Sequence, residues 1–211
     1  MKTLIALCFL ACAARAGLKW ETTEVRLEVH PAQASASAVF RFSNAGKEAV
    51  TIGDVKVGCG CLAPQLAKRT YGPGEEGELT IRFDLGNRSG PQSKTTTVRT
   101  SDGQSVDLVV SGNLPKAYDV LPAMMRIGGT EKTKTARLVN PNPIPIRLLS
   151  ATSSHKELSA ELKTIREGFE YEVLITRKPA ASNARAVIRI ELEPPPGKSD
   201  AKILKLYAHA P

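Results

Sequence analysis

The sequence has little that is typical of an enzyme or of a membrane protein. Only 5% of its 211 residues are aromatic, with a single Trp, and it has four Cys. Helical periodicity is almost absent, and after the first residues no stretch is apolar enough to cross a membrane. It has no glycine-rich phosphate loop, no His-Glu-x-x-His and no Gly-x-Ser-x-Gly motif. We therefore expect a protein that is not an enzyme and has no small-molecule substrate.

Residues 1–16 have the features of a signal peptide. Lys2 gives a short positive start, and the apolar run from Leu4 to Ala13 is too short to span a bilayer. The small residues of Ala-Arg-Ala at the end of the segment predict cleavage after Ala16. The alternatives are a buried N-terminal helix and a lipid anchor on Cys12, which a poor surrounding signal disfavours. We expect the mature protein to be exported from a bacterial cell, into the periplasm, onto the outer surface or into the medium.

Basic residues exceed acidic ones, mainly in the second half of the chain. Without residues 1–16 the chain has 27 Lys+Arg and 21 Asp+Glu, a net charge of +6. Residues 17–117 carry +1 of this charge and residues 118–211 carry +5. The positive half could bind an anionic envelope polymer or lipid head groups. The absence of a dense Lys/Arg block favours simple solvation instead, and the absence of interleaved aromatic residues argues against nucleic acid.

Short alternating segments predict an all-β fold. Apolar and polar residues alternate with the period of a half-buried strand in residues 39–42, 79–83, 95–99, 106–110, 172–176 and 185–191. Turn residues separate these segments at short intervals. Residues 155–165 are the one stretch compatible with a helix, and we expect a strand there. Short strands at this spacing are typical of a β-sandwich or barrel.

The strand pattern occurs twice along the chain. Residues 38–57 align with residues 135–154, each as a strand, an Asn-containing turn and a second strand. We therefore expect two tandem immunoglobulin-like β-sandwiches, residues 17–114 and 115–211, because about 100 residues is the usual size of such a domain. The joint at residues 112–118 is short enough to restrict the angle between them. The alternative is one large β domain.

The turns and proline-rich loops are predicted to serve the folding of the chain. We attribute the turns at Asn44-Ala45-Gly46 and Pro73-Gly74 to the tolerance of Asn and Gly for positive φ. The segments 140–146 and 193–198 are expected to be stiff loops that discourage edge-to-edge pairing of strands. An alternative is that they present an extended polyproline face to a partner.

Cys59 and Cys61 are the only cysteines outside residues 1–16. In a straight strand their Cα atoms would lie about 6.6 Å apart, so a disulfide requires a bend that Gly58 and Gly60 could supply. An oxidising compartment favours that disulfide. The alternatives are buried thiols that pack as small apolar groups, a soft-metal site for Cu(I), and a catalytic thiol. No third ligand is evident for a metal, because the candidates are scattered: Met124, Met125, His30, His155 and His209.

The order of motifs in the first repeat resembles an exported family known as domain of unknown function 1573. The resemblance rests on elements that occur in order: Phe-Arg-Phe-Ser-Asn-Ala-Gly at 40–46, the segment 50–61 that ends in Gly-Cys-Gly-Cys, the segment 71–84 that begins Tyr-Gly-Pro-Gly-Glu-Glu-Gly, Gly90 with Lys94, Thr-Ser-Asp at 100–102 and Leu-Val-Val-Ser-Gly at 108–112. It covers about residues 25–113 and implies export and an immunoglobulin-like sandwich akin to Hydin and major-sperm-protein modules. It implies no chemical activity. Gly58 and Leu62 stand where the family often has Ser and Thr, and the second repeat shares only the strand pattern.

These observations lead to one main hypothesis and two alternatives. The main hypothesis is an exported, non-enzymatic binding or structural module of the cell envelope, with a protein or another envelope component as its partner. The first alternative is a periplasmic thiol-redox or copper-binding protein that uses Cys59 and Cys61. The second is a binder of an anionic envelope polymer through the basic second domain.

Overall fold

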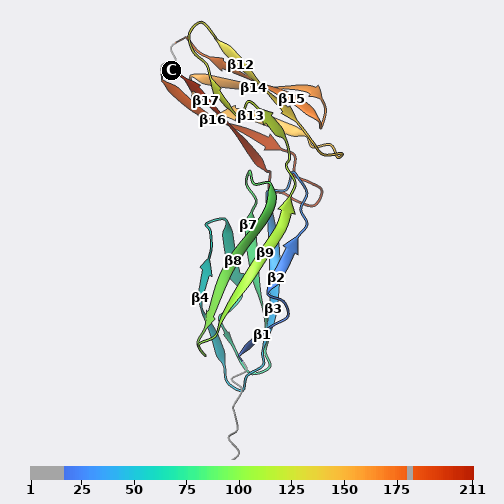
Figure 1. The fold of residues 1–211 in the computed structure, drawn as a ribbon, viewed down its shortest axis with the longest axis vertical. Coiled ribbons are helices and arrows are strands. Elements are labelled where there is room, and N and C mark those ends of the chain that lie inside the picture. Colours follow the sequence, from blue (N-terminus) through green and yellow to red (C-terminus); the bar gives the residue numbers. More distant parts are fainter. Residues whose placement is uncertain (1–16, 180–182) are drawn as a thin grey trace, which may run out of the picture.

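The computed structural model describes residues 17–179 and 183–211, so the predicted signal peptide lies outside the described residues. Throughout these residues the chain forms β-strands and turns, without a helix. The predicted all-β fold class is confirmed, and the segment that was also compatible with a helix forms most of strand β14 (Leu158–Arg166). No helix in the described part of the chain could span a membrane. Figure 1 shows two β-sandwiches that follow one another along the long axis of the molecule.

The first sandwich is made of two sheets. One has the strand order β1-β3-β7-β5 and the other β2-β9-β8-β4-β6. The first sheet contains β1 (Leu18–Trp20), β3 (Ser35–Asn44), β7 (Glu76–Asp84) and β5 (Leu62–Leu66). The second sheet contains β2 (Glu24–Leu27), β9 (Ser105–Leu114), β8 (Gly90–Thr100), β4 (Val50–Val57) and β6 (Thr70–Tyr71). All neighbours are antiparallel except β2 and β9, which are parallel.

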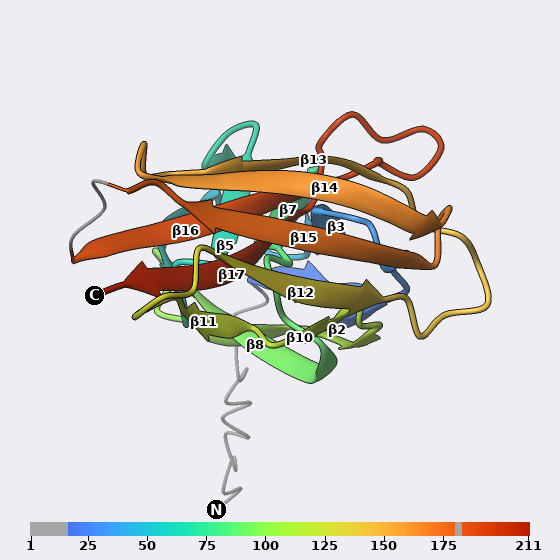
Figure 2. The same cartoon turned by 90° about the horizontal axis from the view of Figure 1, so that it is seen from above.

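The second sandwich also has two sheets, with the orders β10-β12-β15-β14 and β11-β17-β16-β13. Figure 2 looks down on this sandwich and shows β12, β15 and β14 side by side. The first sheet contains β10 (Asp119–Leu121), β12 (Thr133–Val139), β15 (Glu170–Arg177) and β14. The second contains β11 (Met124–Arg126), β17 (Ile203–Ala210), β16 (Ala184–Leu192) and β13 (Leu148–Ser153). Here β11 and β17 form the parallel pair.

The two sandwiches have the same topology. If β6 is left aside, the strands of the first sandwich taken in chain order occupy the same sheet positions as the strands of the second. Even the parallel pair is repeated, since β2 lies beside β9 as β11 lies beside β17. The repeat seen in the sequence therefore corresponds to a repeat of structure.

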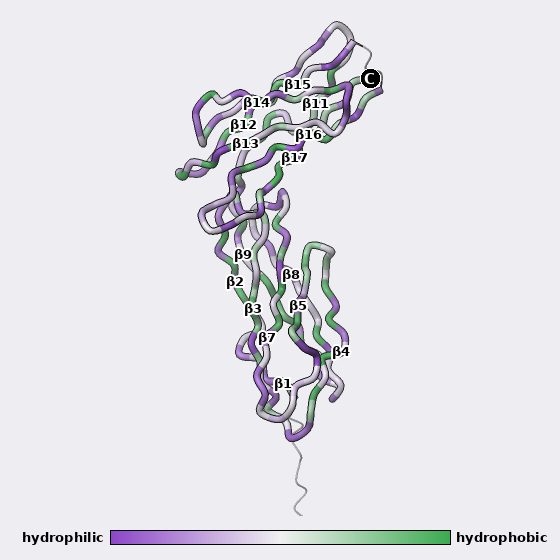
Figure 3. The backbone as a smooth tube through the Cα atoms, turned by 180° about the vertical axis from the view of Figure 1, so that it is seen from behind, coloured by the Kyte–Doolittle hydropathy of each residue, from purple (hydrophilic) through white to green (hydrophobic). Residues whose placement is uncertain are grey.

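Each sandwich has its own apolar core. Along β3 every second side chain is buried, and Figure 3 shows the alternation of polar and apolar residues along the strands. In the first core the ring of Phe42 lies 4.7 Å from that of Trp20 and 4.8 Å from that of Tyr71, measured between centroids. The second core is mostly aliphatic, with Tyr118 and Tyr171 in edge contact. Full burial of a Phe or Leu side chain stabilises the folded state by about 1.5–3 kcal/mol, so the few aromatic rings contribute substantially to the stability of the first core.

A buried asparagine lies at the end of each of the equivalent strands: Asn44 is the last residue of β3, and Asn140 directly follows β12. Asn44 is 1% exposed; its Nδ2 donates to Glu48 O (2.8 Å) and Tyr71 O (2.9 Å), and its Oδ1 accepts from Gly46 N (2.9 Å). Asn140 is 6% exposed, and its Nδ2 donates to carbonyls four and 28 residues further along the chain. Both amides thus satisfy backbone groups where the chain crosses from one sheet to the other.

Two sequence expectations about this region are wrong. The first concerns positive φ, which neither Asn44 nor Gly46 has, whereas Gly74 has a φ of 73°. The first turn therefore uses Asn44 for the hydrogen bonds of its side chain and not for its backbone conformation. The alignment of residues 38–57 with 135–154 is one residue out of register, because it pairs Asn44 with Pro141. A register that pairs Asn44 with Asn140 superposes the buried faces of β3 and β12, whereas a shift of one residue pairs buried with exposed positions.

The junction between the sandwiches includes more than the predicted joint at residues 112–118. The turn before β3 pairs with the segment before β17 through a bridge between Gln33 and Ala201. Ser35 Oγ donates to Asp200 Oδ2 (2.6 Å), and Arg82 forms an ion pair with the same carboxylate (3.3 Å). Ala32 packs in the core of the second sandwich although it lies within the predicted first domain. The 193–198 loop leads directly into these contacts, so the segment that follows it docks on the first sandwich.

We predict that Asn44→Ala and Asn140→Ala will each destabilise the protein by about 2–4 kcal/mol, because each leaves several buried backbone groups without a partner. Urea unfolding measures the loss. Asn113→Ala, at an exposed site on β9, is the matched control and should change stability by less than about 0.5 kcal/mol. Equal effects of Asn44→Ala and Asn113→Ala would contradict the role assigned to the buried amide.

A second prediction concerns His30 at the junction, whose Nδ1 accepts from Ala32 N (3.1 Å). Burial and the nearby Lys202 ammonium hold the pKa of His30 below its usual value near 6.5. As pH falls through about 6.5 the unfolded chain binds more protons than the folded protein, so the free energy of unfolding decreases. We expect His30→Gln to reduce the loss of stability between pH 7.5 and pH 5.5.

Thermal unfolding at a series of pH values measures this effect. His209→Gln, which changes a histidine away from the junction, is the matched control for the loss of an imidazole. An unaltered pH dependence in His30→Gln would show that His30 protonation does not weaken the fold.

Candidate functional site at the Cys59–Cys61 disulfide

The Gly58–Cys61 segment forms the turn between β4 and β5. Gly58 N donates to Thr95 O (2.9 Å), which extends the pairing of β4 with β8 beyond Val57. A Cβ atom on Gly58 would lie 3.0 Å from Thr95 O, whereas a Cβ on Gly60 would meet nothing within 4 Å. Neither glycine has positive φ. Gly58 therefore allows a close approach of two strands, which differs from the conformational freedom expected from the sequence.

Cys59 and Cys61 are joined by a disulfide in the structure, with Cα atoms 5.2 Å apart. This is shorter than the spacing of a straight strand, so the backbone bends as the sequence argument requires. Cys61 is 8% exposed and belongs to the first core, against which the half-buried Cys59 also packs. The bend is held by backbone hydrogen bonds from Leu62 N to Cys59 O (3.3 Å) and from Asp84 N to Cys61 O (2.9 Å).

The surroundings of the disulfide bear on the alternatives for the cysteine pair. Two sulfurs joined in a disulfide present no thiolate to a metal or to a substrate. Within residues 17–179 and 183–211, no group of three or more His, Cys, Asp or Glu side chains is placed to hold a metal ion. Met124, Met125, His155 and His209 belong to the second sandwich. The geometry therefore suits a small structural or redox-active disulfide better than a resting Cu(I) site.

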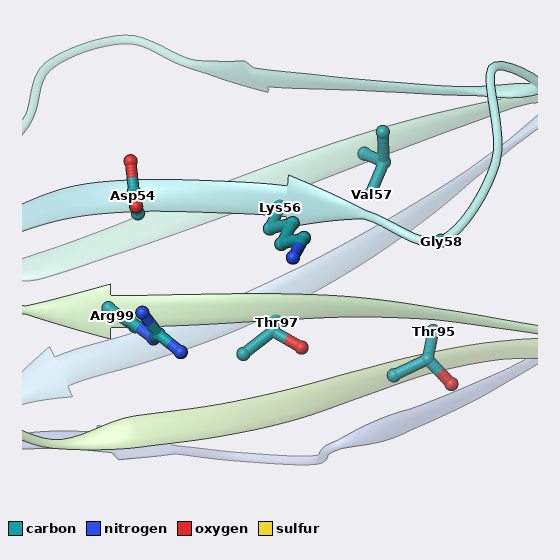
Figure 4. Close-up of a pocket in the computed structure, with 7 residues that line it drawn as sticks. All are labelled: Asp54, Lys56, Val57, Gly58, Thr95, Thr97 and Arg99. Atoms are coloured by element: carbon teal, nitrogen blue, oxygen red, sulfur yellow. The ribbon is translucent and has the colours of Figure 1, made fainter.

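A shallow groove of about 260 Å³ lies beside the turn, on the outer face of β4 and β8. Figure 4 shows its lining: Asp54, Lys56, Val57, Gly58, Thr95, Thr97 and Arg99. Thr97 Oγ1 donates to Asp107 Oδ1 (2.6 Å) on the next strand. The lining has hydrogen-bonding groups and both signs of charge. The groove can therefore hold a polar group of a partner.

The other predicted motif residues are not part of this site. Asn44, Gly46 and Gly74 meet at the far end of the first sandwich, where Gly74 N donates to Asn44 O (2.8 Å). Pro73 belongs to the same turn as Gly74. The disulfide is at the end that faces the second sandwich, because Asp84, which contacts Cys61, is paired with Ser35 of the junction. The structure thus separates the motif into a folding element and a disulfide turn.

Comparison with known proteins agrees with this description of the first sandwich. Residues 18–114, just under half of the chain, match the model of the family described as Protein of unknown function (DUF1573). The resemblance to that family is confirmed for the first sandwich. The match ends at Leu114, the last residue of β9, so the second sandwich lies outside it. None of the curated proteins is similar enough in sequence to be matched to this chain.

Solved structures with a similar fold are distant in sequence. A protein of unknown function from Porphyromonas gingivalis W83 is 14% identical, with a TM-score of 0.36 over 91% of this chain and 99% of that one. The periplasmic chaperone SfaE is 11% identical, with a TM-score of 0.38 over 92% and 98%. The ASH/PapD-like domain of human CEP192 is 10% identical, with a TM-score of 0.39 over 56% and 98%. Scores this low leave the role of the chain to be argued from its own residues.

Gly58 and Gly60 lie in the same turn but differ in their surroundings, so substituting each by Ala tests the geometry of the turn. We expect Gly58→Ala to destabilise the protein by about 1–2 kcal/mol, because its Cβ would press on Thr95 O and separate β4 from β8. Gly60→Ala meets open space at negative φ and should be neutral or stabilising by up to about 1 kcal/mol. Urea unfolding of the two variants makes the comparison. Equal destabilisation would show that the close approach to β8 is not what requires Gly58.

The disulfide itself should contribute little to stability. It closes a loop with a single intervening residue, so the chain-entropy contribution is only about 1–2 kcal/mol. We expect Cys59→Ala/Cys61→Ala to fold and to lose about that amount in urea unfolding. A reductant should destabilise the wild-type protein to a similar extent and leave the variant unchanged. A variant that fails to fold would show that the pair is a principal staple of the first sandwich.

Proposed function

We propose that this chain is an exported, non-enzymatic binding module of the cell envelope, and that it holds a protein partner on its second sandwich. The sequence of residues 1–16 supports export, and the family match of the first sandwich agrees with a protein to which no chemistry is assigned. The observation that carries the proposal is an exposed groove on the outer face of the sheet β11-β17-β16-β13.

The groove has the composition of a protein-binding surface. It has a volume of about 360 Å³ and is lined by Met124, Ser154, Arg185, Ala186, Val187, Tyr207, Ala208 and His209. Met124 and Tyr207 are paired on β11 and β17, and they are 75% and 47% exposed. Met, Tyr and Arg are enriched at interfaces, where they combine large contact area with adaptable or polar ends.

Charge defines the kind of partner that fits this groove. Arg126 is paired with His209 in the sheet register, and His209 is paired with Arg185 on its other side. Neither guanidinium forms an ion pair within the described part of the chain. A partner segment that places an apolar side chain between Met124 and Tyr207, with carboxylates on either side, would complement both features.

The test begins with capture of the partner in intact cells. A photoreactive amino acid at Val187 crosslinks whatever occupies the groove, and mass spectrometry identifies it. Binding is then measured with purified proteins. We expect Met124→Ser/Tyr207→Ser to weaken binding at least about 10-fold, as for the anchor residues of an interface. Leu149→Ser, which removes an exposed apolar residue on β13, is the control and should bind normally.

Two results would overturn the proposal. One is a partner that binds the double variant as tightly as it binds the wild-type protein. The other is a reproducible turnover that a single substitution abolishes. Export is tested separately by the intact mass of the mature protein and its cell fraction, with Gly17 expected as the first residue.

A redox role for Cys59 and Cys61 is the second candidate, because the two sulfurs are bonded and Cys59 is only half-buried. It predicts that the disulfide cycles with a thiol partner, or that the reduced pair takes up Cu(I). Cys59→Ser/Cys61→Ser should abolish either behaviour with the fold intact. Alkylation of the purified protein with and without reductant shows whether the reduced form occurs in the cell.

A further inference from the structure

A pocket of about 200 Å³ lies between the two sandwiches. Asn87, Arg88 and Ser89, between β7 and β8, line it from the first sandwich. The joint and the second sandwich provide Lys116, Ala117, Tyr118, Val120, Ala123, Lys202, Leu204 and Lys205. Four of these side chains are basic and none is acidic. Pockets between domains are common ligand sites, and this one is too small for a polymer.

The positive charge of this pocket is largely unbalanced. Lys116 forms an ion pair with Asp119. Arg88 Nη1 donates to the backbone oxygen of Asp84 (3.2 Å), and neither Arg88 nor Lys205 forms an ion pair with a carboxylate of the described residues. Four cations are thus gathered around a small space with one paired carboxylate. An anion in this space would offset the repulsion between them.

Lys202 is the most unusual of the four basic residues. It is 4% exposed, and its Nζ donates to Pro31 O (3.0 Å) across the junction. An ammonium group has three donors, and a buried cation without a counter-charge is costly. Burial lowers the pKa of Lys202, because the charged ammonium is less stable away from water than the neutral amine. An apolar side chain of similar length would fill this position without that cost.

We propose that this pocket binds a small oxyanion, such as a phosphate group, and that the bound anion joins the two sandwiches. The ligand would contact Arg88 of the first sandwich together with Lys202 and Lys205 of the second. Asn87 already connects the two, because in the amide orientation that satisfies both atoms its Nδ2 donates to Ile203 O (2.8 Å) and its Oδ1 accepts from Lys205 N (3.2 Å).

The bound anion would act on the junction by mass action. It binds only when both sets of basic residues face the same space, so it stabilises the docked arrangement of the two sandwiches. The presentation of the groove on the second sandwich, relative to the disulfide turn on the first, would then depend on the concentration of the anion. This inference does not depend on the identity of a protein partner.

Calorimetric titration of the full mature protein with inorganic phosphate is the main experiment, with potassium chloride at equal ionic strength as the reference. We expect saturable binding at one site and a rise in the unfolding temperature beyond that in chloride. Arg88→Gln and Lys202→Met should each weaken binding at least about 10-fold. Arg41→Gln, an exposed guanidinium on β3, is the matched control and should bind phosphate normally.

Hydrogen exchange gives a readout that does not depend on the variants. Phosphate should slow amide exchange in residues 86–90 and 200–205 of the wild-type protein and leave the 44–48 turn unchanged. Flotation with phosphatidylglycerol vesicles distinguishes the source of the anion. Flotation of the wild-type protein but not of Arg88→Gln would assign a lipid headgroup, and its absence beside saturable phosphate binding would assign a soluble ligand.

Two results would overturn the inference. The first is a protein that responds to neither phosphate nor vesicles beyond the chloride reference. The second is Arg88→Gln binding phosphate as tightly as Arg41→Gln does, since this would place the anion elsewhere on the basic surface.

Discussion

Each sandwich must satisfy the backbone where its chain crosses from one sheet to the other, and a buried asparagine side chain does so in both. At Asn44 and at Asn140 one amide donates to two carbonyls and accepts from one backbone N–H. A crossing segment cannot use the hydrogen bonds of either sheet, so without this amide its polar groups would be buried unpaired. The crossing also positions β4, and β4 in turn carries the disulfide turn. The candidate site of the first sandwich therefore depends on a hydrogen-bonding group at its opposite end.

Much of the fold follows from the alternation of side chains in the sequence. A period of two residues marks most of the long strands, and its repetition marks the two sandwiches. The role of Asn44 was not predicted, because a local turn and a buried cap have the same residues in sequence. The junction was not predictable either, since Ser35 and Asp200 are 165 residues apart and only the folded chain brings them together. Lys202 did leave a signal: it directly precedes β17, and the alternation of the buried Leu204, Leu206 and Ala208, continued back by two residues, predicts that its side chain points inward.

The geometry of the cysteine pair was only partly predictable from the sequence. The spacing of Cys59 and Cys61 required a bend for a disulfide, and the structure has that bend. The sequence could not distinguish bending freedom from close approach as the reason for Gly58, because both need the absence of a side chain. Only the position of Thr95 O on the neighbouring strand separates the two explanations. The exposed groove of Met124 and Tyr207 was missed for a related reason, since it is formed by the parallel pairing of short β11 with the last strand.

The packing of Ala32 in the second core has a consequence for the order in which the chain is assembled. Most of the first sandwich is complete once β9 has been synthesised, but the turn around Ala32 has its partners among residues 117–210. During synthesis or translocation the apolar side of this turn therefore remains exposed until the segment that leads into β17 has been added. A chain stalled before residue 200 would lack the segment that bridges Gln33, so the turn around Ala32 would stay without that partner.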